Sequence, residues 1–374
     1  MSENRFRAGT LLGFFLLVLG CGFIESADLK SLVKDIFPIP STTGNEDLLA
    51  GRVRSVLPKT FIVEDDGLGG LAVRLGQGEP NVVIVAALDG YGFIVSGITP
   101  DGYLRVDRAV PAPHAQFDGY LLGQPVVIST RKGPVSGVVA QPAMHLLTAE
   151  VRKTVVENFS LENAFVDIGV RSEAEARGKG VEILDSLTFW PQLTELAGER
   201  WAGPSLGVKA LCAALISAAA DFEKSPPAGE IILVWAAQTK FALRGRGPRV
   251  SLGGARARNR WQPQRTIILD IVAAGKGAGT PGLGKGPVLV QAKDAPTPLR
   301  QGLERSAGAG GVSLQYLAGA ETPLLAAFGD AASDVVALAL PVQFVHTPSE
   351  IVDLKDLQAL RDILGRFLKS GGEK

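Results

Sequence analysis

Residues 81–92, with the sequence NVVIVAALDGYG, decide the fold expected for this chain. The apolar run over residues 81–85 is typical of a strand that is buried on both faces of a sheet. The run ends in two alanines followed by Asp89. Because α/β proteins bind their ligands just beyond the carboxyl ends of such strands, Asp89 is the first candidate residue of a site.

Composition limits the classes of protein to which the chain can belong. Its 374 residues suffice for about two domains. Lys plus Arg and Asp plus Glu each number 38, so the net charge is zero, which excludes the electrostatic footprint of a general nucleic-acid binder. The segment 244–265 nevertheless carries seven arginines and no acidic residue. Charge blocks of this kind are usually solvated, so we expect a solvated loop there.

The first residues resemble a targeting segment. Arg5 and Arg7 precede an apolar run over residues 8–19, which is the pattern of a secretory signal. Residues 18–21, VLGC, resemble a bacterial lipobox, in which Cys21 would be lipidated. An uncleaved membrane anchor is the alternative. Residues 1–28 are therefore predicted to be a signal or anchor, which makes the protein secreted or membrane-anchored outside the cytoplasm, and a lipidated Cys21 would leave Cys212 without a disulfide partner.

Hydrophobic periodicity divides the rest of the chain into two patterns. Between residues 93 and 139, short β runs alternate with turns, as in a small antiparallel barrel. Longer apolar strands at 231–236 and 266–271, and a helical stripe after Asp353, are typical of an α/β domain. We predict a three-layer α/β/α domain, formed by residues 29–88 and 168–374, that is interrupted by a β domain over residues 89–167.

Several motifs occur in a fixed order along the chain. They are STTGNE at 41–46, DGLGG at 66–70, PAMH at 142–145, DIGVRSEAEA at 167–176 and LGKGP at 283–287. Each is weak alone, but the ordered set resembles the TET-type (deblocking or glutamyl) aminopeptidases, a family of dinuclear metallopeptidases also known as endoglucanase M. The resemblance covers nearly everything after Ala27, and it implies a zinc-peptidase-like α/β/α fold with an inserted barrel.

The resemblance also implies a catalytic centre with five metal ligands and one glutamate as general base. Two divalent ions share a bridging aspartate and activate a water, whose proton the glutamate accepts. Two ligand positions are retained, as Asp270 and His346. Side chains without a nitrogen, oxygen or sulfur donor cannot coordinate a metal. The positions that occupy or adjoin a lost ligand or the lost base are Ala87, Gly203, Thr239 and Lys240.

These losses lead to a prediction and two alternatives. We expect a catalytically impaired protein without a cofactor, whose former cleft holds Asp89, Lys240 and Asp330 and binds a peptide-like or anionic ligand. Lys240 would repel a divalent ion. The first alternative is an active metal-dependent aminopeptidase with an atypical zinc or cobalt site. The second, glycoside hydrolysis, follows only from the endoglucanase name and needs two carboxylates flanking a cleft.

Other polar residues could in principle rebuild a site, although each has a simpler interpretation. Acids near turns and helix ends are usually structural, and His114 and His145 lie in loop or turn contexts of the β domain. Family members assemble through this domain, but a lipid tether on Cys21 would restrict the chain to a homodimer. The acids considered are Glu46, Asp65, Asp66, Asp330 and Asp334.

Overall fold

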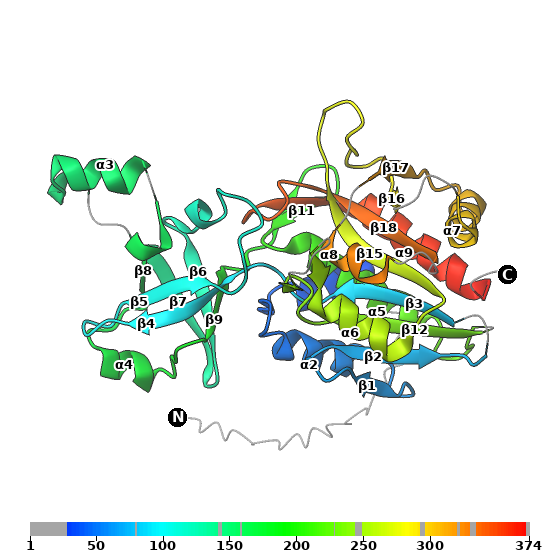
Figure 1. The fold of residues 1–374 in the computed structure, drawn as a ribbon, viewed down its shortest axis with the longest axis horizontal. Helices are drawn as coiled ribbons and strands as arrows, with labels where there is room; N and C mark the ends of the chain where they lie inside the picture. Colours follow the sequence, from blue (N-terminus) through cyan, green and yellow to red (C-terminus); the bar gives the residue numbers. More distant parts are fainter. Residues whose placement is uncertain are drawn as a thin grey trace, which may run out of the picture.

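The computed structural model describes residues 28–78, 81–140, 144–157, 159–227, 229–243, 249–291, 296–319, 322–329 and 334–371. Cys21 and the predicted signal lie outside these residues. The chain forms an α/β body and a separate β-barrel, which lie side by side in Figure 1. The three-layer α/β/α architecture with an inserted antiparallel barrel is therefore confirmed.

A mixed sheet of eleven strands is the centre of the α/β body. Four neighbouring strands, in the order β12-β3-β15-β18, are parallel. The others extend the sheet on both sides by antiparallel pairing, except that β17 pairs with β16 in parallel. The strands are β1 Val63–Asp65, β2 Leu71–Leu75, β3 Asn81–Ala87, β10 Thr194–Leu196, β11 Arg200–Gly203, β12 Glu230–Ala236, β15 Arg265–Ala273, β16 Val288–Gln291, β17 Gln315–Ala318, β18 Asp334–Gln343 and β19 Glu350–Asp353.

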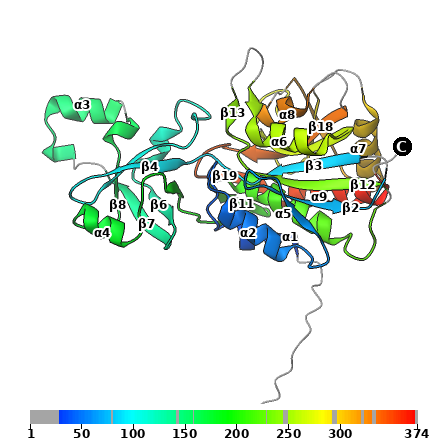
Figure 2. The same cartoon turned by 60° about the horizontal axis from the view of Figure 1, so that its bottom comes forward.

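Helices cover both faces of this sheet (Figure 2). One face packs against α1 Leu29–Ile36, α2 Asp47–Val56, α5 Leu206–Ala220, α7 Pro298–Ala309 and α9 Leu354–Lys369. The other packs against α6 Leu252–Trp261 and α8 Pro323–Phe328. Val82 and Ile84 of β3 enter the first core, whereas Val83 and Val85 enter the second. Residues 81–85 are thus a strand buried on both faces, as predicted.

The barrel closes through six strands in the order β4-β5-β8-β7-β6-β9. Its last strand, β9, pairs with both β4 and β6, so it lies beyond the predicted boundary at residue 167. The correction has a physical reason, because without β9 the barrel would have two open edges. The elements are β4 Phe93–Ile98, β5 Leu104–Arg108, η1 Asp118–Leu121, β6 Pro125–Thr130, β7 Gly133–Ala140, η2 Met144–Leu146, α3 Ala149–Glu157, η3 Leu161–Asn163, β8 Phe165–Asp167, α4 Glu173–Gly178 and β9 Ser186–Phe189.

The described part of the arginine-rich segment, residues 249–265, is folded and is not a solvated loop. It forms β14 Val250–Ser251, which pairs with β13 Ala242–Leu243, and then α6. The Ser251 hydroxyl caps α6 by accepting a hydrogen bond from the Gly254 N–H at 3.0 Å. Arg256 donates a hydrogen bond to the Asp66 carbonyl, and Arg260 forms a salt bridge with Glu64. Within the described ranges, no helix is both long and apolar enough to span a membrane.

Candidate active-site cleft

Asp89 lies at the carboxyl edge of the parallel strands, two residues after β3, and is completely buried. Its Oδ1 accepts hydrogen bonds from the N–H and the hydroxyl of Thr239, at 2.9 and 2.6 Å. Its Oδ2 accepts from the Thr43 hydroxyl at 2.7 Å and the Lys240 N–H at 2.9 Å. With these four accepted bonds, the Asp89 carboxyl group fixes the loop after β12.

The Lys240 side chain is partly buried near several carboxyl groups. Burial alone would lower the pKa of Lys240, but Asp270 and Asp89, with smaller effects of Tyr91 and Glu350, raise it above its ordinary value. Lys240 is therefore a permanent ammonium ion, and its charge is compensated. The carboxyl groups of Asp270, Asp89 and Glu350 offset this charge, which argues against the expected reversal of the cleft from negative to positive.

Glu350 and His346 complete a small pocket with Lys240 and Tyr91. Glu350 accepts hydrogen bonds from the Gly207 N–H at 3.0 Å and the His346 N–H at 2.9 Å. Burial nevertheless raises the pKa of Glu350 to about 6. Burial and the Lys240 cation lower the pKa of His346 to about 3, so its imidazole is neutral. Its Nδ1 lies 3.9 Å from Glu350 Oε1, too far for a hydrogen bond.

Glu46 supports the same edge from the N-terminal segment. Its Oε1 accepts hydrogen bonds from the Gly44 N–H at 2.9 Å and the Gln238 N–H at 2.7 Å. Burial, with a smaller effect of Asp89, raises the pKa of Glu46 to about 7. Oε1 of Glu46 therefore holds the loops of Gly44 and Gln238 together.

Left-handed backbone conformations gather around this pocket. Ser205, Gln238, Phe344 and His346 have φ angles of 52°, 54°, 55° and 62°. Such conformations cost energy in residues other than glycine and cluster at functional sites. The strain marks the ends of β11, β12 and β18 as a built site, although Ser205 makes no side-chain cap on α5.

Two of the positions predicted to have lost a ligand are closed by packing. Ala87 is 5% exposed and belongs to the hydrophobic core. A Cβ atom on Gly203 would lie 2.5 Å from Cζ of Phe37, closer than real contacts allow. The Phe37 ring therefore occupies the space that a bridging aspartate on Gly203 would need.

Of the other predicted residues, Asp270 and Thr239 lie at the cleft, whereas the remaining described ones lie elsewhere. Asp270 lies on β15 and is almost buried, and Thr239 is held by Asp89. Asp334 begins β18 at the opposite edge of the sheet, so it does not line the cleft. Its Oδ2 accepts a hydrogen bond from the Leu299 N–H. Asp330 lies outside the described residues. The remaining candidates are Asp65, which is exposed and pairs with Arg54, Asp66, which is buried in a turn, and His145, which is exposed.

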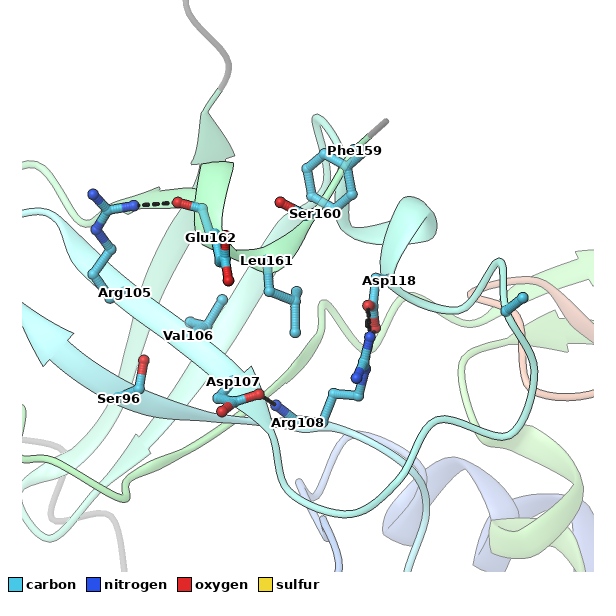
Figure 3. A pocket seen from close by; sticks show the side chains of 11 residues that line it. Ser96, Arg105, Val106, Asp107, Arg108, Asp118, Phe159, Ser160, Leu161 and Glu162 are labelled. Atoms are coloured by element: carbon cyan, nitrogen blue, oxygen red, sulfur yellow. Dashed lines mark hydrogen bonds and ion pairs between the residues drawn. The ribbon is translucent and has the colours of Figure 1, made fainter. Parts of the chain in front are cut away.

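A further groove lies on the barrel, between β5 and the short helices η1 and η3 (Figure 3). Its cations are used internally: Arg108 pairs with Asp118, and Arg105 donates to the Glu162 carbonyl at 2.6 Å. The Arg105 guanidinium also stacks on Phe165, 3.9 Å from the ring centroid. The two arginines of this groove are therefore already bonded, and none of its lining residues has a left-handed backbone, so the cleft remains the stronger candidate.

An α/β/α body with an inserted barrel, and polar groups at the carboxyl edge of its parallel strands, defines the metallopeptidase class of fold. Residues 69–363 match the M42 glutamyl aminopeptidase family. The chain therefore belongs to this family.

Similar proteins agree with this assignment. The lysyl aminopeptidase of Pyrococcus furiosus is 28% identical over 340 residues, which are 87% of this chain and 92% of the relative. The TET1 peptidase of Pyrococcus horikoshii, which assembles into a tetrahedron or an octahedral shell, has a TM-score of 0.79 and 24% identity over 91% of this chain and 99% of its own. A TET aminopeptidase from a marine thaumarchaeote has a TM-score of 0.76 and 22% identity, with 91% and 96% covered.

Family membership corrects one prediction. TET aminopeptidases of the M42 family depend on two metal ions, so the expectation that the chain uses no cofactor is wrong for its family. The residues described here do not fit that dinuclear centre. Among them, no group of three or more His, Cys, Asp or Glu side chains could hold a metal, and Phe37 fills the position beside Gly203.

The sequence reasoning missed two important residues. Glu350 follows His346 by four residues, and a carboxyl group so close to a predicted ligand was a usable signal. Lys209 lies in an otherwise apolar helix, where only the fold shows that it is 4% exposed.

Proposed function

We propose that this member of the M42 family binds peptides through their free amino-terminal group in the pocket formed by Lys240, His346, Glu350 and Tyr91. The observation that carries the proposal is the excess of carboxyl groups around one compensated ammonium ion. With His346 neutral, the pocket favours a cation over an anion. A peptide α-ammonium group is such a cation, and the names of the relatives describe peptidases that act at this end.

Calorimetric titration with trialanine and with N-acetyl-trialanine tests the proposal. The free peptide should bind about tenfold more tightly, or about 1.4 kcal/mol, because acetylation removes its charge. Glu350→Gln should remove this difference, whereas Glu173→Gln on exposed helix α4 should keep it. Equal affinity of the wild-type protein for both peptides would overturn the proposal.

The comparisons favour a second candidate, an active aminopeptidase with an atypical metal site that includes Asp270 and His346. The family match and the aminopeptidase relatives support it. The test is metal analysis of the purified protein together with alanine release from trialanine in the presence of cobalt or zinc. Stoichiometric metal that is lost in Asp270→Ala or His346→Ala, together with turnover, would establish it. Turnover without that dependence would contradict it.

The location and assembly of the protein are also proposals. Arg5, Arg7 and the apolar run before Cys21 support export, with lipidation of Cys21 as the anchor. The shell-forming structures support an oligomer, larger than the predicted homodimer, that assembles through the barrel domain. Mass spectrometry of the mature amino terminus and light scattering of the purified protein test the two statements.

A further inference from the structure

A second pocket lies beside the peptide pocket and contains a different kind of lysine. Lys209, in the first turn of α5, lines it together with residues of the segment 37–41 and of β9. The walls include the rings of Phe37, Tyr91 and Phe189, together with Ser41, Thr188 and Ser205. Among the residues that line this pocket, Lys209 is the one basic residue.

The Lys209 amine donates two hydrogen bonds. Its Nζ donates to the Ile39 carbonyl and, at 2.9 Å, to the Ser41 hydroxyl. The Ser41 hydroxyl donates its own hydrogen to the Leu88 carbonyl at 2.7 Å, so the amine must be the donor to Ser41. In the described chain, no carboxyl group contributes to the charge balance of Lys209.

This arrangement suits a neutral amine. An NH₂ group has two hydrogens, and both are used, whereas an ammonium ion would bury a third N–H without a partner at high cost. Burial lowers the pKa of Lys209 to about 7, with a small opposing effect of Cys212, which agrees with the hydrogen-bond geometry. The nitrogen lone pair is then free, as in lysines that act as nucleophiles in apolar pockets.

We propose that Lys209 is a carbonyl-reactive site that takes a small aldehyde or ketone with an apolar body. The Nζ lone pair attacks the carbonyl carbon and forms a C–N bond, while the carbonyl oxygen takes up the amine proton and becomes a hydroxyl group. The carbinolamine then loses water, which leaves an imine. One carbonyl compound and one amine thus give one imine and one water, without an oxidant or a reductant.

Reductive labelling with propanal and cyanoborohydride at pH 7, followed by peptide mapping, tests this site in the whole protein. Lys209 should be labelled at least tenfold faster than the exposed Lys59 and Lys224, which are internal references. In urea, where the pocket is lost, the three rates should become equal. Lys209→Met should remove its own label and leave the label on Lys59 unchanged.

Two results would overturn the proposal. The first is native labelling of Lys209 that is no faster than that of Lys59. The second is preferential labelling of Lys209 that persists in urea, because this would place the reactivity in the local sequence and not in the pocket. Both results come from the wild-type chain, so the test does not depend on the folding of the variant.

Discussion

Two lysines lie in neighbouring pockets at the junction of the barrel and the sheet, and their surroundings differ. Lys240 lies near Asp270, Asp89 and Glu350, which raise its pKa despite burial. The Lys209 amine donates hydrogen bonds to a carbonyl and a hydroxyl group, and burial lowers its pKa to about 7. Burial therefore does not determine the charge of a lysine here, whereas the presence of carboxyl groups does.

The two pockets consequently differ in the chemistry that they can perform. The pocket of Lys240 contains fixed charges and suits a charged ligand. The pocket of Lys209 contains a neutral amine among rings and suits a carbonyl compound. A comparison of matched substitutions at the two lysines tests this difference.

Lys240→Met should have the largest effect. Removing the cation leaves buried carboxyl groups uncompensated, so the free energy of unfolding at pH 8 should fall by about 3 kcal/mol. Lys209→Met is the matched control, and it should lower this free energy much less. The loss of its two hydrogen bonds is offset by removal of an amine that is charged in the unfolded chain and neutral in the folded one. Urea unfolding of both variants measures the difference, and equal losses would contradict the comparison.

The second largest effect should be a dependence of the free energy of unfolding on pH that arises from Lys209. Its pKa is about 7 in the folded protein and 10.5 in the unfolded chain. The unfolded state thus binds more protons between pH 7 and 9, and stability should rise with pH in this window, by about 2 kcal/mol. The increase should be absent from Lys209→Met in urea unfolding at the two pH values. Glu350 and Glu46 titrate near or below the start of this window, so a rise that persists in the variant would contradict the assignment.

Gly203→Ala should lower the free energy of unfolding by about 2 kcal/mol or less, because the new Cβ displaces Phe37. Phe37 also lines the pocket of Lys209, so propanal labelling of Lys209 should slow in this variant. Gly178→Ala, where a Cβ atom meets nothing within 4 Å, is the control for stability and labelling. Full stability of Gly203→Ala would show that the position beside Phe37 can accept a side chain.

Asp118→Asn on the barrel should have the smallest effect. Asp118 is buried, but its partner Arg108 is largely exposed, so the pair contributes about 1 kcal/mol or less. Peptide binding and labelling should not change, because the barrel groove is separate from both lysine pockets. A loss comparable to that of Lys240→Met would contradict this ranking.

Much of the fold follows from the sequence because it rests on local patterns. The apolar run at 81–85 gave a buried strand, and the alternation after residue 92 gave a barrel. Closure of the barrel by β9 could not be predicted, because it depends on pairing with β4 and β6 at a distance. Residues 252–261 of the arginine-rich segment form a helix, which Ser251 caps and in which Arg256 and Arg260 bond to partners outside the helix.

The candidate site was only partly predictable. Asp89 and the exchange of carboxylates for Lys240 are visible in the sequence, but the compensation of Lys240 is not, because it depends on Glu350 and Asp270 from other strands. The burial of Lys209 is likewise a property of the packed helix α5. Residue types in the sequence suggest which groups form a site. Which charges compensate one another can be known only from the positions of those groups in the fold.

The most direct test is an NMR titration of the two lysines in the protein with ¹³C at the lysine Cε positions, assigned with Lys209→Met and Lys240→Met. We expect Lys209 to titrate near pH 7, and we expect the pKa of Lys240 to lie above its ordinary value of 10.5. Two signals that both titrate near 10.5 would contradict the account.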